Sequence, residues 1–271
     1  MTGTTIGSVR ILGAAFFSTH HASAQDLLAG RERAFTPPSY GLLVGRARRF
    51  TSLLTQMHIE VCGALQSIAA EPPIAVFATC HGEIQTAEKL LAEFREGAMV
   101  SSARFALSVH NTASGLYSVA IGSHAPTTTV TGANAIAAGW LEASLTALEA
   151  QQTVLLSIAD EPIPAALQGP SEVGAAAAFL LGVAPGAGRA AQLVVAPSIE
   201  RGRTPSPPAK PSGPLPPDSL RLSIESPDIN PLQVLARAVD AVTRDEAATV
   251  PLGRIQPGAT LELRFPQDAR A

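Results

Sequence analysis

The sequence predicts an α/β fold, in which helices cover a sheet, and three observations carry that prediction. Short, uninterrupted apolar runs recur along the 271 residues, each bounded by Pro, Gly or polar residues, as expected for strands buried on both faces. Segments with apolar residues at helical spacing alternate with these runs. The composition is 46% hydrophobic and 15% charged, which suits either a well-buried core or an apolar face that a partner covers.

The N-terminal part predicts two buried strands and three helices. Residues 52–69 have the clearest helical spacing, and Pro72-Pro73 end that helix. Gly97 ends the third helix in the usual C-terminal manner. In chain order, the expected elements are a strand at 9–17, a short helix at 23–28, the helix at 52–69, a strand at 74–78 and a helix at 84–94.

The stretch 105–142 contains a corner that resembles the seat of a nucleophile. Small residues, Gly132-Ala133-Asn134, separate a β-branched run from an apolar helix. The first residue of such a helix faces unpaired N–H groups and the positive end of the dipole, which would favour a Cys thiolate. Here the position holds Asn134. The expected elements are a strand at 105–109, a helix at 116–121, a strand at 127–131 and a helix at 135–148.

The second half predicts further alternation and then a change of composition. Residues 201–218 are too rich in Pro to pack and are expected to form a linker or loop. In the last strand, apolar and charged residues alternate, which predicts one solvated face and an edge or antiparallel position. The expected elements are a strand at 153–159, an Ala-rich helix at 173–183 capped by Ser171, strands at 191–196 and 219–225, a helix at 232–243 begun by Pro231, and a strand at 260–266.

Charge and cysteine content argue against several classes of protein. The net charge is −3, without a basic stripe or aromatic ladder, so nucleic-acid binding is not expected. Cys62 and Cys80 have neither metal spacing nor a disulfide framework, which fits a reduced cytosol. No signal peptide is recognisable and no apolar run approaches the roughly 20 residues of a membrane span, so a cytoplasmic protein that binds no membrane is expected.

Cys80 and His81 are the most direct candidates for nucleophilic chemistry. Neighbouring residues of a strand point to opposite faces, however, so a small buried Cys80 in a structural turn is the expected state. All six histidines lie at or before His124, and Lys210, the one lysine of the second half, lies in the Pro-rich segment, so a mechanism that needs a C-terminal His or Lys is excluded. Three other histidines are expected at the surface or in loops: His20, His21 and His58.

A resemblance to a known family lies in the stretch SVHNTASGLYSVAIG and, two residues later, APTTTVTGANAIAAGWLEA. This stretch resembles the N-terminal half of a β-ketoacyl synthase, of the thiolase-like fold, and most closely the half-length chain-length factors found beside aryl-polyene and related polyketide-type gene clusters. The resemblance covers about residues 8–200, and three further motifs match in order and spacing: Arg48-Arg49-Phe50-Thr51-Ser52-Leu53, Cys80-His81-Gly82-Glu83 and Ile158-Ala159-Asp160-Glu161-Pro162.

The resemblance implies a thiolase-like half fold, with a mixed sheet covered by helices. It assigns residues 1–200 to a ketoacyl-synthase-like N-terminal domain. The Pro-rich linker at 201–218 follows, and residues 219–271 are expected to form a strand-helix-strand extension that completes the sheet.

The same resemblance implies a protein without catalytic activity. In catalytic members the corner after the β-branched strand carries the acylated Cys, and two His come from the second half of the fold. The matching position here is Asn134, whose amide cannot form a thioester, and no His follows His124. The implied protein is a chain-length-factor-like subunit, without cofactor or metal, that pairs with an active ketosynthase. It would shape that enzyme's acyl tunnel in fatty-acid, polyene or polyketide-type biosynthesis and meet the acyl carrier protein through the partner.

In the family, the strand matching 127–130 pairs across the dimer, which places its neighbours at the interface or tunnel. Trp140 fits a plain core aromatic equally well. The candidates are Asn111, Thr128, Thr129, Val130, Asn134 and Trp140. Two alternatives stay open: a stand-alone acyl-thioester enzyme that uses Cys80, or a Ser such as Ser108, and a homodimeric acyl-binding scaffold.

Overall fold

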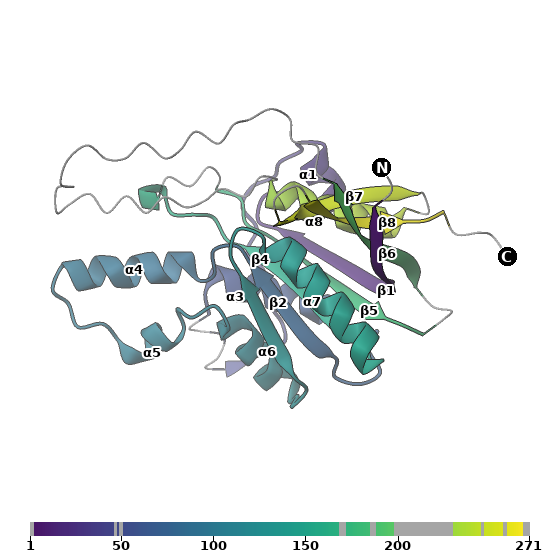
Figure 1. Cartoon of the computed structure of the whole chain (residues 1–271). Coiled ribbons are helices and arrows are strands. Elements are labelled where there is room, and N and C mark those ends of the chain that lie inside the picture. The colour runs from purple at the N-terminus through teal and green to yellow at the C-terminus, as the bar shows by residue number, and fades with distance from the viewer. Residues whose placement is uncertain are drawn as a thin grey trace.

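The computed structural model describes residues 3–45, 48, 51–167, 172–184, 188–197, 230–244, 247–256 and 259–267. Within these residues one sheet of eight strands has the order β3-β2-β4-β5-β1-β6-β8-β7 (Figure 1). β2 runs parallel to β3 and β4, and the other neighbours are antiparallel. The strands are β1 (Thr4–Ser18), β2 (Ile74–Thr79), β3 (Thr127–Thr131), β4 (Val154–Asp160), β5 (Ala175–Gly182), β6 (Arg189–Pro197), β7 (Ala248–Gln256) and β8 (Ala259–Phe265).

Helices cover both faces of this sheet. α7 and α8 pack on one face, and α3 and α6 pack on the other. α4 and α5 project from the body on the side opposite β7 and β8 (Figure 1). The helices are α1 (Ala24–Leu28), α3 (Leu53–Leu65), α4 (Ile84–Arg95), α5 (Ser102–Ala106), α6 (Thr112–Ile121), α7 (Ala135–Ala150) and α8 (Pro231–Thr243).

The predicted α/β class with a mixed, helix-covered sheet is confirmed, and β4 shows why the strands of this sheet are mainly apolar. Leu156 and Ile158 pack towards α7, whereas Leu155 and Ala159 pack towards α3. A strand buried on both faces has no solvated position, so every residue of β4 is buried.

The predicted helix at 173–183 is wrong, because these residues form strand β5. Ala favours helices in isolation, but β5 lies between β4 and β1 and all eight of its residues are buried. Ala176 and Ala178 lie in the cluster beneath α3, where small side chains let the helix approach the sheet. Tertiary packing therefore overrides local propensity, and the proposed cap, Ser171, lies outside the described residues.

The predicted strand at 105–109 is also wrong. Residues Ser102–Ala106 form the short helix α5, whose N-cap Ser101 accepts a hydrogen bond from the Arg104 N–H at 3.5 Å. Phe105 is 62% exposed, so this apolar run is not part of the sheet. Capping by Ser101 was a stronger local signal than the apolar run that follows it.

The C-terminal residues complete the sheet through a hairpin. β8 lies antiparallel to β6, as expected for its alternating pattern, and β7 then forms the outer edge. Sequence reasoning assigned no element to β7. This strand contains Pro251, whose missing N–H is tolerated at the edge of a sheet. α8 begins as predicted, with Pro231 at its first turn and Asn230 as its cap. The predicted linker at 201–218 and strand at 219–225 lie outside the described residues.

Candidate functional site

The corner between β3 and α7 has the predicted geometry. Gly132 has φ of +112°, a conformation that only glycine adopts without strain, and its carbonyl accepts the Ala135 N–H at 2.9 Å. Asn134 is the N-cap residue of α7, is exposed, and makes no side-chain capping hydrogen bond. The Asn134 side-chain amide is therefore exposed at the start of a buried helix and does not cap that helix.

Strand β3 leaves one of its edges open. The Ala75 N–H donates to the Pro126 carbonyl at 3.1 Å, and Ala75 is in register with Thr127. Bonding residues alternate along a parallel ladder, so Thr128 directs its backbone groups to β2 while Thr129 directs its groups away. No strand of the described residues pairs with that outer side. An unpaired edge of this kind is a template for a strand of another chain.

Helix α6 braces this edge from the α3 side of the sheet. The hydroxyl groups of Ser114 and Thr129 are hydrogen-bonded at 3.1 Å. Asn111 is the exposed N-cap of α6, and its carbonyl accepts the Ser114 hydroxyl at 3.0 Å. The structure thus brings Asn111 and Thr129, two sequence-predicted candidates, to the first turn of one helix.

Thr128, Val130 and Trp140 complete the set of predicted candidates. Thr128 is exposed and Val130 is half-buried on β3. Trp140, in contrast, is fully buried on α7, and its ring packs on Phe179 with centroids 4.7 Å apart. The indole N–H finds no acceptor among the described residues. Trp140 therefore lies in the core of this chain, away from the β3 edge.

A groove of about 460 Å³ opens at the carboxyl ends of β2 and β3, next to this corner. The loop after β2 and the loop before α6 form its walls, where the Gly82 backbone lies against His110. The lining residues are Cys80, His81, Gly82, Glu83, Ala87, Ser108, Val109, His110, Thr131 and Gly132.

Asp160, at the end of β4, holds the loop that forms the groove's floor. Its Oδ1 atom accepts hydrogen bonds from the Thr79 hydroxyl at 2.8 Å, the Cys80 N–H at 2.8 Å and the His81 N–H at 3.3 Å. Burial raises the pKa of the Asp160 carboxyl against the opposing effect of these bonds. Sequence reasoning named this strand end but not its role. The available signal was an acid at the end of a mainly apolar run, because the ends of parallel strands β2 and β4 meet at one edge of the sheet.

Glu161 joins the starts of two helices. One carboxylate oxygen accepts the Gln85 N–H of α4 at 2.9 Å, and the other accepts the Leu54 N–H of α3 at 3.3 Å. Burial, joined by the nearby charge of Glu83, raises the pKa of the Glu161 carboxyl to about 7 even though both bonds favour the ionised form. Glu83 in turn accepts the Thr55 hydroxyl at 2.8 Å.

We expect the free energy of unfolding to fall as the pH rises from about 5 to 8. A carboxyl whose pKa is raised from 4.5 to about 7 holds its proton more tightly in the folded chain. Its contribution is therefore fully present below pH 4.5 and is lost as the pH passes 7, by about 3 kcal/mol at most. Urea titrations between pH 4 and 9 measure this slope.

The matched variant for this measurement is Glu161→Gln, which keeps one carbonyl acceptor and cannot ionise. It should flatten most of the slope, and the remainder should come from Glu83 and Asp160, whose pKa values are raised in the same direction. An unchanged slope in Glu161→Gln would contradict the role assigned to this carboxyl.

Cys80 does not have the environment of a nucleophile. The side chain is 7% exposed, and burial together with the Asp160 charge raises the pKa of the Cys80 thiol far above neutrality. Within the described residues, no histidine nitrogen is hydrogen-bonded to this sulfur. The loop geometry therefore favours the structural interpretation of Cys80.

Two histidines that were expected at the surface are buried, so that expectation is corrected. His58 is 1% exposed, its Nδ1 lies 2.8 Å from the Ser157 hydroxyl, and burial lowers the pKa of its imidazole to about 3. His21 is also buried and lies 3.0 Å from the Ser18 hydroxyl. Neither ring reaches the groove, so both serve as satisfied polar groups of the core.

The projecting arm, which consists of α4, α5 and the loop between them, exposes apolar side chains to solvent. Met99 is 97% exposed, Phe94 is 70% exposed and Phe105 is 62% exposed. The arm is tied internally by an ion pair between Arg104 and Glu93 at 2.6 Å, but only Leu90 of α4 is buried. Three large exposed apolar side chains within twelve residues make this segment a candidate interaction surface.

The described residues contain no cluster of His, Cys, Asp and Glu suited to a metal ion. Of the helices that the structure describes, none has both the length and the apolar character that a bilayer crossing requires.

The model of the β-ketoacyl synthase N-terminal domain family matches residues 29–220 of the sequence, which is more than half of the chain. The chain belongs to this family. That membership confirms the resemblance found in the sequence and accounts for the strand, corner and buried helix around Asn134. No curated protein matches the sequence.

Solved structures agree on the fold. The chain is similar to a ketosynthase (ApeO) in complex with its chain length factor (ApeC) from Xenorhabdus doucetiae, with a TM-score of 0.66 and 17% identity over 95% of this chain and 99% of that chain. It is also similar to the ishigamide ketosynthase/chain length factor, with a TM-score of 0.55 and 15% identity over 72% of this chain and 69% of that chain. A third similar structure is a β-ketoacyl synthase from Burkholderia phymatum STM815, with a TM-score of 0.53 and 12% identity over 66% of this chain and 60% of that chain. The thiolase-like ketosynthase fold is thus confirmed.

Proposed function

We propose that this protein is a non-catalytic, chain-length-factor-like subunit that pairs with an active β-ketoacyl synthase and shapes the tunnel for its growing acyl chain. One continuous feature carries the proposal. The open edge of β3 leads directly into a helix start that holds Asn134 where catalytic relatives hold a nucleophile. Two of the similar structures are named as ketosynthases with chain length factors, which supports a ketosynthase-like subunit in polyene or polyketide-type biosynthesis.

The lack of a usable nucleophile supports the non-catalytic part. The Asn134 amide has a delocalised nitrogen lone pair and cannot form a thioester. Cys80 is the cysteine that lines the groove beside this corner, and the raised pKa of its thiol keeps it protonated. No histidine follows His124 in the sequence, so residues 125–271 offer no imidazole base.

Two surfaces support the proposed pairing with a ketosynthase. The β3 edge offers unpaired backbone groups, and the arm of α4 and α5 offers exposed apolar side chains. A ketosynthase subunit that extends the sheet across β3 would also cover apolar surface on this arm. The groove beside Asn134 would then become this chain's portion of the shared acyl tunnel, and acyl carrier protein would be met through the partner.

Co-expression with a ketosynthase encoded beside this chain tests the proposal. We expect a one-to-one complex by native mass spectrometry, with a product length that changes when groove residues such as Val109 are enlarged. A chain that stays monodisperse alone and never co-purifies with that ketosynthase would refute the pairing. The β3 edge also suits a second copy of this chain, and a mass of two identical subunits would support the homodimeric scaffold instead.

We expect Asn134→Cys to gain a reactive thiol without gaining condensing activity. The new side chain is exposed at a helix start, which lowers a thiol pKa, whereas the two catalytic histidines are still missing. A chloroacetyl probe should label the variant and leave the wild-type chain unlabelled, by intact mass. Stoichiometric labelling of Cys80 in the wild type, or elongation by the variant without a ketosynthase, would contradict the non-catalytic assignment.

A further inference from the structure

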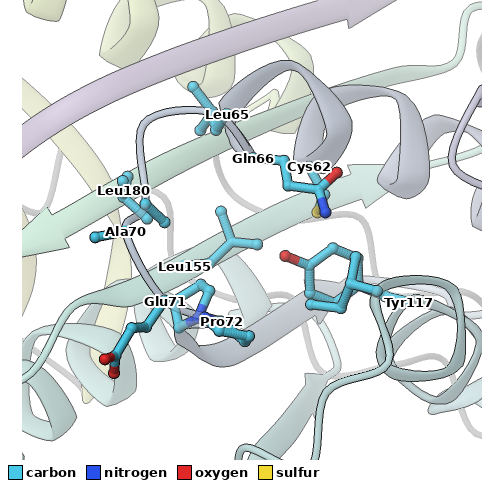
Figure 2. Close-up of a pocket in the computed structure, with 12 residues that line it drawn as sticks. Cys62, Leu65, Gln66, Ala70, Glu71, Pro72, Tyr117, Leu155 and Leu180 are labelled. Atoms are coloured by element: carbon cyan, nitrogen blue, oxygen red, sulfur yellow. The ribbon is translucent and has the colours of Figure 1, made fainter.

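A second cavity, of about 210 Å³, lies at the opposite end of β2 from the groove (Figure 2). It opens between the end of α3, helix α6 and the sheet, beside Pro72 and Pro73, which precede β2. Its wall exposes polar and apolar surface in similar amounts, and its apolar part includes Leu65, Leu155 and Leu180 from α3, β4 and β5. Nothing in the proposed pairing with a ketosynthase uses this cavity.

The Tyr117 hydroxyl is the polar feature of this cavity. Figure 2 shows the hydroxyl oxygen directed into the space between Cys62, Gln66 and Leu155. The Tyr117 side chain is 2% exposed, and no residue that the structure describes makes a hydrogen bond to its hydroxyl group. Burial raises the pKa of the Tyr117 phenol above its ordinary value of 10, so the group is a hydrogen-bond donor at any physiological pH.

The charges around the cavity restrict what it can hold. Its lining contains no Lys, Arg or His, and its one acid, Glu71, is exposed and points away from the Tyr117 hydroxyl (Figure 2). Burial also raises the pKa of the Cys62 thiol to about 12, so no thiolate forms there. An anion would find no positive charge in this lining, whereas a neutral molecule with one acceptor atom could receive a hydrogen bond from the Tyr117 hydroxyl.

We propose that this cavity is a binding site for a small neutral carbonyl compound with an apolar body, whose oxygen accepts a hydrogen bond from the Tyr117 hydroxyl. The cavity volume suits a ring with a short substituent, since an engineered apolar cavity of about 150 Å³ already holds benzene. The leucines would pack against the apolar body and Gln66 would lie at the mouth. Apolar side chains together with a few convergent polar groups are typical of ligand sites.

Acetophenone and ethylbenzene, which differ mainly in the carbonyl oxygen, serve as the probe pair. Titrations of the full chain, followed by amide chemical shifts and calorimetry, should show saturable binding of both. Acetophenone should bind roughly three- to tenfold more tightly, the range expected for one hydrogen bond. No saturable binding of acetophenone to the wild-type chain overturns the proposal.

Two variants localise the site. Tyr117→Phe keeps the shape of the cavity and should abolish the preference for acetophenone while retaining binding of both probes. Ala69→Leu, at a half-buried wall position, should fill the space and weaken both probes at least tenfold. A preference that survives in Tyr117→Phe, or binding that is unaffected in Ala69→Leu, would place the ligand elsewhere and refute the assignment.

Discussion

Thr129→Pro is expected to abolish the association of this chain with the proposed ketosynthase partner, with Kd raised about a hundredfold or more, or roughly 3 kcal/mol. Proline removes the outward N–H of the central residue of β3 and places a ring where a neighbouring strand would pair. The internal ladder should survive, because the backbone groups of Thr128, not those of Thr129, face β2. Native mass spectrometry and analytical ultracentrifugation of co-expressed chains measure the effect.

The matched control is Thr129→Val, which keeps the outward N–H and the β-branched shape and loses only the hydrogen bond to Ser114. This control should associate within about threefold of the wild type, a difference of well under 1 kcal/mol. If both variants pair normally while the circular dichroism spectrum of each is native, the partner does not use the β3 edge.

Asp160→Ala is expected to lower the free energy of unfolding by about 3–5 kcal/mol. The fully buried carboxylate oxygen accepts three hydrogen bonds from the loop of Thr79, Cys80 and His81, and alanine would leave those donors buried and unpaired. Urea unfolding of the full chain at pH 7 measures the loss, which is a large fraction of the stability of a typical domain.

Asp160→Asn separates the hydrogen bonds from the charge. Its carbonyl can still accept the three bonds, and it lacks the buried charge whose burial raises the carboxyl pKa. We expect this variant to lose less than half of what Asp160→Ala loses. Equal losses would mean that the charge, and not acceptance by Oδ1, holds the loop.

Strands buried on both faces and capped helices could be predicted from the sequence because their signals are local. β2 and β4 appear as mainly apolar runs, and α8 begins at Asn230-Pro231 as capping chemistry requires. β5 could not be predicted in this way, since its Ala residues favour a helix and only the neighbouring strands β4 and β1 make it a strand. The edge strand β7 was also missed. It contains Pro251, which a central strand would not tolerate, and only its position at the edge of the sheet allows this residue.

In the candidate site, too, the features with local sequence signals could be predicted and those that depend on distant residues could not. The corner at Asn134 and the β-branched strand before it could be predicted, because small residues and branched residues have strong local preferences. Asp160 and Glu161 were visible only as the end of a strand, since their partners lie about 80 and 76–107 residues away in the sequence. Trp140 gave no signal that separates a core position from a tunnel position, and its ring contact with Phe179 is long-range.

The long strand β1 determines when the sheet can close during synthesis. β1 is made first, yet it lies between β5 and β6, whose residues begin only at Ala175. At roughly 5–20 residues per second, on the order of 10–30 s pass before a ribosome has supplied either neighbour. Throughout that interval β1 lacks both of the strands that it pairs with in the folded sheet, so its pairing must follow the synthesis of β5 and β6.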